Sequence, residues 1–157
     1  MKLVVGIVYT PFIPGGEELE NAIDIASREI GSCARVVDAA TDVLTLLDVS
    51  GEFDTLVLVA PSPNAPAGRY IRVEYRLPTK KRDYFEVVED IRASMEGSLD
   101  VDDLVKALDA MMNARGEAKR VIVYKCGRGG CRDALAEALR EAKRISGCEK
   151  PLGYDRQ

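Results

Sequence analysis

The sequence predicts an α/β domain, a three-layer sandwich whose mostly parallel sheet is covered by helices on both faces. Short apolar runs alternate along the chain with stretches in which apolar residues recur at helical spacing. This alternation is typical of buried parallel strands joined by amphipathic helices. Residues 69–77 instead alternate apolar and polar side chains, which predicts a strand with one wet face. We therefore expect about five strands, one of them an antiparallel edge strand.

The first part of the chain provides three of the expected strands and two helices. In order, they are a strand at 3–8, a helix at 19–31, a strand at 34–37, a helix at 41–49 and a strand at 55–60. Gly31 can end the first helix, because glycine readily adopts the left-handed conformation that follows a helix. Thr41 or Asp42 can cap the second helix. The run at 55–60, Thr-Leu-Val-Leu-Val-Ala, predicts a buried central strand.

The second part of the chain begins with the edge strand and continues to a C-terminal helix. The expected elements are a strand at 69–77, a loop or short helix at 79–97, a helix at 101–112, a strand at 121–124 and a helix at 135–145. A chain of 157 residues is close to the usual size of one domain. We expect a single domain over residues 1–147 and a loose tail over residues 148–157.

The overall composition argues against nucleic acid or a membrane as partner. The net charge is −4, which gives no general attraction to nucleic acid or anionic lipid. No apolar run approaches the ~20 residues needed to span a bilayer, and the first apolar run lacks the basic segment of a signal peptide. We therefore expect a cytoplasmic protein. Its four cysteines are expected to be thiols, with Cys33 and Cys148 as unpaired residues, since a core of this size needs no disulfides.

The absence of histidine excludes several kinds of active site. The chain contains no histidine, so serine and cysteine triads that depend on an imidazole base cannot form. Neither a Walker loop nor a dinucleotide-binding Gly-x-Gly-x-x-Gly follows the first strand. The residues therefore identify no catalytic group.

A ligand crevice is expected at the carboxyl ends of the parallel strands, where loops and helix N-termini converge. One of these loops is Cys-Gly-Arg-Gly-Gly-Cys at 126–131. Its two thiols could bind a soft metal with Glu17 or Glu18, or cycle as a dithiol. Alternatively, its N–H groups could hold a phosphate-bearing ligand, or the segment is a plain glycine-rich turn. Residues expected to line the ligand are Gly15, Gly16, Thr41, Gly127, Arg128, Gly129 and Gly130.

Several of the stretches around this crevice resemble a known family. They are residues 6–11 (Gly-Ile-Val-Tyr-Thr-Pro), 15–18 (Gly-Gly-Glu-Glu), 36–42 (Val-Val-Asp-Ala-Ala-Thr-Asp) and 54–60 (Asp-Thr-Leu-Val-Leu-Val-Ala). Together they resemble the hydrogenase maturation endopeptidases, and a weaker similarity extends over most of the chain. The resemblance implies a role in processing or docking the C-terminus of the large-subunit precursor of a nickel-iron hydrogenase.

The same resemblance implies a site in which two carboxylates and a histidine sense nickel. Glu17 or Glu18 matches the first carboxylate, Ala60 and Pro61 stand where the second is expected, and Asp100 stands close to the histidine position. Together with the two cysteines of the loop at 126–131, which are a departure from the family, the candidate metal ligands are Glu17, Glu18, Asp100, Cys126 and Cys131, with nickel or zinc as the ion. The acidic residues also have structural interpretations. Glu17 and Glu18 can offset a helix dipole, and Asp100 can cap the helix that begins near Val101.

Overall fold

Five strands form one mixed sheet in the order β2-β1-β3-β5-β4. Our computed structural model describes residues 2–10, 12–39, 43–81, 83–95 and 101–148. Parallel pairing joins β1 to β2 and β3, and β3 to β5, whereas β4 is antiparallel to β5. The strands are β1 (Leu3–Ile7), β2 (Arg35–Asp38), β3 (Thr55–Pro61), β4 (Tyr70–Leu77) and β5 (Lys119–Cys126). The predicted α/β class, with one antiparallel edge strand, is confirmed.

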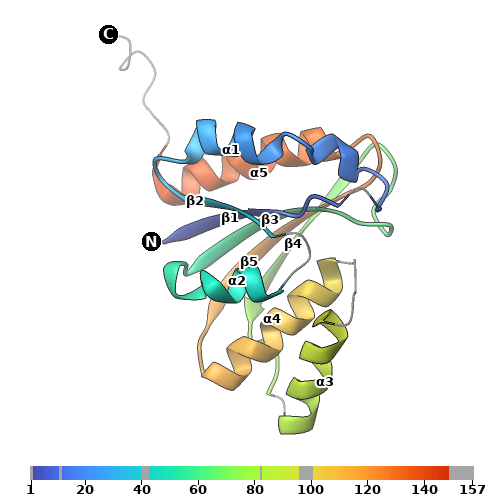
Figure 1. Ribbon diagram of the computed structural model, residues 1–157. Coiled ribbons are helices and arrows are strands. Elements are labelled where there is room, and N and C mark those ends of the chain that lie inside the picture. The colour runs from blue at the N-terminus through green and yellow to red at the C-terminus, as the bar shows by residue number, and fades with distance from the viewer. Residues whose placement is uncertain (1, 11, 40–42, 82, 96–100, 149–157) are drawn as a thin grey trace.

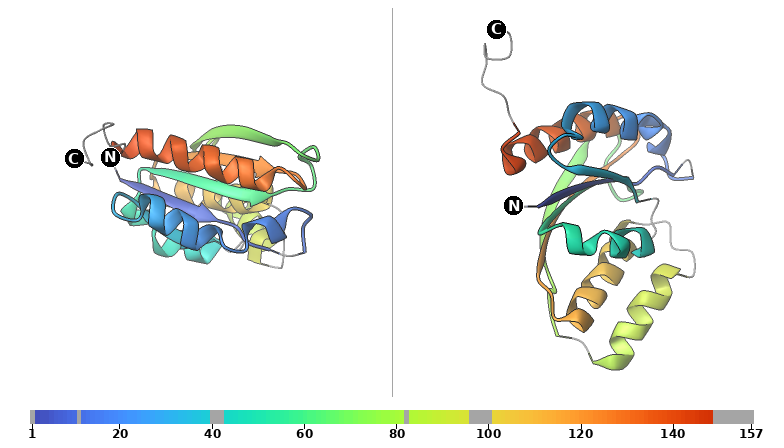
Figure 2. Two further views of the ribbon diagram at one scale, coloured as in Figure 1. Left: turned by 90° about the horizontal axis from the view of Figure 1, so that it is seen from above. Right: turned by 60° about the vertical axis from the view of Figure 1, so that its left-hand side comes forward.

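Helices cover both faces of this sheet (Figure 1). One face carries α1 (Ala22–Ile30) and α5 (Cys131–Ser146), and the other carries α2 (Val43–Asp48) and α4 (Val101–Arg115). Helix α3 (Tyr84–Met95) packs on α4 at the outside of the second layer (Figure 2). Two short 3-10 helices, η1 (Gly16–Leu19) and η2 (Ser50–Glu52), precede α1 and β3. The segment 79–97, predicted to be a loop or short helix, contains α3, a helix of 12 residues.

The continuous apolar runs of the central strands follow from burial on both faces. In β1, Val5 packs in the core below α1 and α5, and its neighbour Val4 packs in the core of α2 and α4. In β3, Val57 packs in the core below α1 and α5, and Leu56 packs in the core of α2 and α4. A strand buried in this way shows no alternation of polarity, because both pleat directions point into apolar layers.

The predicted pairing state of the cysteines is wrong. Cys33 is bonded to Cys148, and Cys126 is bonded to Cys131. The fold brings the Cα atoms of the first pair to 5.9 Å across 115 residues of sequence, which satisfies the distance that a disulfide requires. Cys148 was expected to begin a loose tail, but it is tied to the turn after α1. The rest of that tail, 149–157, lies outside the described residues.

Candidate functional site

The loop between β5 and α5 packs directly on the loop between β3 and β4, at the carboxyl end of the parallel strands. The N–H of Gly127 donates to the carbonyl of Arg69 at 2.9 Å, and the N–H of Gly68 donates to the carbonyl of Arg128 at 2.6 Å. The N–H of Ser62 donates to the carbonyl of Cys126 at 3.0 Å. These backbone bonds hold the two loops together as one edge of the expected crevice.

The close approach of the two loops explains the glycines of the segment 127–130. A Cβ added to Gly127 would lie 2.1 Å from the carbonyl oxygen of Pro66, and one added to Gly130 would lie 2.3 Å from that of Arg69. Gly129 has a φ of 85°, a conformation that side chains disfavour. The glycine-rich turn is therefore required by packing.

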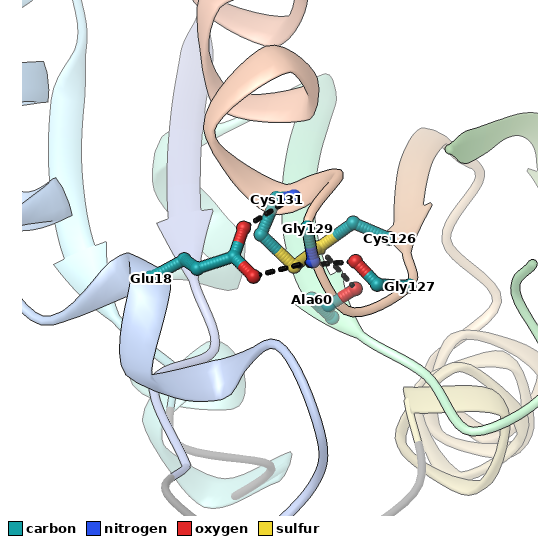
Figure 3. Close-up of a disulfide and its surroundings, with 6 residues drawn as sticks. All are labelled: Glu18, Ala60, Cys126, Gly127, Gly129 and Cys131. Carbon is teal, nitrogen blue, oxygen red and sulfur yellow. Dashed lines mark hydrogen bonds between the residues drawn. A yellow bond between two sulfur atoms is a disulfide. The ribbon is translucent and has the colours of Figure 1, made fainter. Parts of the chain in front are cut away.

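The Cys126–Cys131 disulfide closes this turn (Figure 3). It joins the last residue of β5 to the first residue of α5, and both cysteines are fully buried. Each sulfur also lies near a carbonyl oxygen: Cys126 Sγ is 3.3 Å from Ala60 O, and Cys131 Sγ is 3.7 Å from Gly127 O. In the reduced form both thiols would thus have an acceptor for their protons.

The Glu18 side chain points from η1 into the N–H groups of this turn (Figure 3). Its carboxylate accepts hydrogen bonds from the N–H of Gly129 at 2.5 Å and from the N–H of Cys131 at 3.0 Å. A carboxylate at the first turn of α5 also offsets the positive end of that helix dipole. Two N–H groups of the loop are therefore occupied by a carboxylate of the same chain.

The other predicted site residues are only partly brought together. Gly15, with a φ of 96°, begins η1 beside the disulfide, where an added Cβ would lie 3.0 Å from Cys131 Sγ. Gly16 is buried, whereas Glu17 and Arg128 are exposed. Thr41 and Asp100 lie outside the described residues.

The candidate ligands within the described residues do not fit nickel or zinc. In the part of the chain that the structure describes, no group of three or more His, Cys, Asp and Glu residues is placed to hold a metal ion. Cys126 and Cys131 are bonded to each other, so neither sulfur is the thiolate that a soft metal prefers. Both carboxylate oxygens of Glu18 accept hydrogen bonds from backbone N–H groups.

An exposed aromatic residue in the crevice loop was missed from the sequence. Phe12 is 79% exposed in the loop that follows β1. An exposed aromatic side chain of this size is a frequent anchor in protein interfaces. The signal was present in the sequence as Pro-Phe-Ile-Pro at 11–14, because a phenylalanine between prolines has no helix or strand to pack it.

A second missed feature is a partly buried ionic network, in which the Glu141 side chain is 9% exposed and that of Arg72 is 37% exposed. The Glu141 carboxylate of α5 accepts hydrogen bonds from Arg72 Nε at 2.9 Å and Arg72 Nη2 at 2.6 Å, and from the Tyr124 hydroxyl. The hydrogen bonds from Arg72 hold the pKa of Glu141 below its usual value. Burial, followed by the bond to Glu141, raises the pKa of Tyr124 to about 12. This network fixes α5 on strands β4 and β5.

Comparison with known proteins gives matches among solved structures alone. No protein-family model and no curated protein sequence matches the chain. Solved hydrogenase maturation proteases are similar to it. The [NiFe] hydrogenase maturation protease HybD from Thermococcus kodakarensis has 12% sequence identity, a TM-score of 0.49, and coverage of 93% of this chain and 99% of its own. An endopeptidase from Escherichia coli has 16% identity and a TM-score of 0.49, and the hydrogenase maturating endopeptidase HybD from E. coli has 14% and 0.48. Each of these two matches covers 94% of both chains.

None of the described helices is long and apolar enough to cross a bilayer.

Proposed function

We propose that the protein docks the large-subunit precursor of a nickel-iron hydrogenase at the carboxyl edge of its sheet and does not cleave it by metal-dependent chemistry. The partner follows from the resemblance of residues 6–11, 15–18, 36–42 and 54–60 to the hydrogenase maturation endopeptidases. The docking role is carried by one observation. Glu18, one of the two carboxylates that could match the first metal ligand, is held by the N–H groups of Gly129 and Cys131.

Phe12 supplies the expected anchor for that docking. It is 79% exposed in a loop at the same edge as the disulfide-closed turn. Burying a phenylalanine side chain against a partner contributes about 1.5–3 kcal/mol. The short backbone hydrogen bonds beneath the edge keep the loops in place, which lowers the entropy lost on binding.

The proposal is tested with purified protein and a purified large-subunit precursor that retains its C-terminal extension. Binding is measured by calorimetry, and the intact mass of the precursor is followed with and without nickel. We expect wild-type protein to bind and the mass to stay unchanged. Phe12→Ser should weaken binding at least about tenfold, while Phe85→Ser should not, although Phe85 on α3 is 77% exposed. Loss of the extension would contradict a docking role, and failure of the wild type to bind would overturn the proposed partner.

The disulfide favours a second candidate function, reversible thiol chemistry. An external dithiol would transfer two electrons and two protons to the Cys126–Cys131 bond, which would leave two thiols here and a disulfide in the reductant. The carbonyl oxygens near both sulfurs suit the reduced form. Mass spectrometry after alkylation in graded dithiol buffers tests it. Reversible reduction with an unchanged circular dichroism spectrum supports this function, and reduction that unfolds the chain excludes it.

A further inference from the structure

A groove runs between two segments that lie far apart in the sequence, η1 with α1 on one side and α5 on the other. Its volume is about 440 Å³. We call it the α1/α5 groove. Its apolar lining residues are Ile25, Leu135, Ala136 and Leu139. Both Ile25 and Ala136 keep solvent-accessible surface, so apolar groups of a partner would find apolar contacts there.

The rim of this groove is acidic. Four glutamates and a single arginine are among its lining residues. Glu18 is bound by the turn at α5, and Glu29 pairs with Lys143 at 3.2 Å. Glu17 and Glu20 are exposed, and neither side chain has a hydrogen bond or ion pair within the described residues. The four glutamates of the lining outnumber its one arginine, Arg132, so the groove carries a net negative charge.

We propose that the α1/α5 groove binds a protein segment that carries lysine or arginine beside apolar side chains. A groove between two helices is a common receptor for an amphipathic segment, which places its apolar side chains on the floor. The charge complementarity selects a basic partner, because a like-charged segment would face Glu17 and Glu20 at close range. An acidic peptide, nucleic acid or anionic lipid is disfavoured for the same reason.

The groove lies between helices on one face of the sheet, and the docking proposed above uses the loops at the sheet edge. The two proposals share η1 but rest on different residues. Ile25, Ala136 and Glu20 play no part in the argument for hydrogenase docking. Failure of one proposal thus leaves the other standing.

The test uses three probes and the full chain. The first is a blocked twelve-residue peptide that repeats Leu-Lys-Lys-Leu, the second has glutamate in place of lysine, and the third is spermine, which carries charge without apolar side chains. Binding is followed by calorimetry and by chemical-shift changes of the backbone amides. We expect binding of the lysine peptide alone, with shifts concentrated at the groove residues. Equal binding of spermine, binding of the glutamate peptide, or shifts confined to another face would overturn the proposal.

Matched variants separate the two features of the groove. Glu17→Gln combined with Glu20→Gln should weaken the lysine peptide about five- to tenfold, and higher salt should reduce the difference. Asp24→Asn is the charge control, because Asp24 is exposed on α1 but does not line the groove.

Ala136→Trp should fill the groove and weaken binding at least tenfold, whereas Ala114→Trp, at an exposed position of α4, should not. Equal effects within either pair would contradict the assigned site.

Discussion

Glu18 and Cys131 are joined by a hydrogen bond of 3.0 Å from the Cys131 N–H to the Glu18 carboxylate, across 113 residues of sequence. The bond ties η1 to the first turn of α5, at the position where the Cys126–Cys131 disulfide also ends. The parallel strands β1, β2, β3 and β5 all end at this edge. Glu18 joins the loop after β1 to the turn after β5. The conformation of the candidate site thus depends on Glu18, which is one of the two carboxylates that the resemblance offers as a metal ligand.

Replacing Glu18 with alanine should measurably destabilise the fold. The variant leaves the N–H groups of Gly129 and Cys131 without their carboxylate. Losing such a capping interaction costs about 1–2 kcal/mol, to be read from urea unfolding at pH 7. Glu17→Ala is the control, because Glu17 is the exposed neighbour of Glu18. This substitution should change the free energy of unfolding by less than about 0.5 kcal/mol. Equal losses in the two variants would show that the hydrogen bonds to Glu18 add nothing.

Gly127→Ala should be far more damaging than an alanine at another loop glycine. The added methyl group would meet the carbonyl oxygen of Pro66 at 2.1 Å, so one of the two packed loops must move. Overpacking of this kind costs about 1–3 kcal/mol. Gly51→Ala in η2 has no atom within 4 Å of the new Cβ and should leave the melting temperature nearly unchanged. A Gly127→Ala protein that melts with the wild type would argue against the close packing of these loops.

The sequence predicted the sheet well because each strand carries its own burial pattern. The uniformly apolar run at 55–60 is β3 at the middle of the sheet, and the alternating run at 69–77 is β4 at its edge. Such patterns are local, since they record which faces of one strand meet apolar layers. They need no knowledge of the rest of the chain.

The candidate site was less predictable because its contacts are long-range. The glycines of the turn at 126–131 left several uses open, among them an anion site, and the contact with Glu18 depends on how η1 packs against α5. The pairing of Cys33 with Cys148 depends likewise on two helices ending at the same side of the sheet. Sequence spacing contains no signal for either contact.

The Cys33–Cys148 disulfide should stabilise the protein through the long loop it closes. The two residues are 115 positions apart, and closing a loop of this length lowers the entropy of the unfolded chain by the equivalent of about 5 kcal/mol at most. We expect Cys33→Ser to lower the free energy of unfolding by several kcal/mol in non-reducing buffer. Addition of a thiol reductant should bring wild-type and variant proteins together. A difference that persists in full after complete reduction would assign the effect to the side chain at position 33.

Glu141→Gln should make the stability of the protein less dependent on acid pH. Arg72, and then the Tyr124 hydroxyl, hold the pKa of Glu141 below its ordinary value of 4.5. Because the folded-state pKa is depressed, the stabilisation is fully present above about pH 4.5 and is lost as the pH falls through the folded-state value.

At pH 7 the variant should therefore lose about 2 kcal/mol, since glutamine cannot supply the charge that a buried hydrogen-bonded pair requires. The gap between variant and wild type should close as the pH falls from about 4.5 through the lowered pKa of Glu141. Glu52→Gln is a matched control, because Glu52 also accepts two hydrogen bonds from an arginine, Arg35, but with both side chains about half exposed. Solvent screens such a pair, so its loss should cost less than about 1 kcal/mol. Urea unfolding of the three proteins between pH 3 and pH 8 measures both effects, and parallel curves for Glu141→Gln and wild type would place the acid sensitivity elsewhere in the fold.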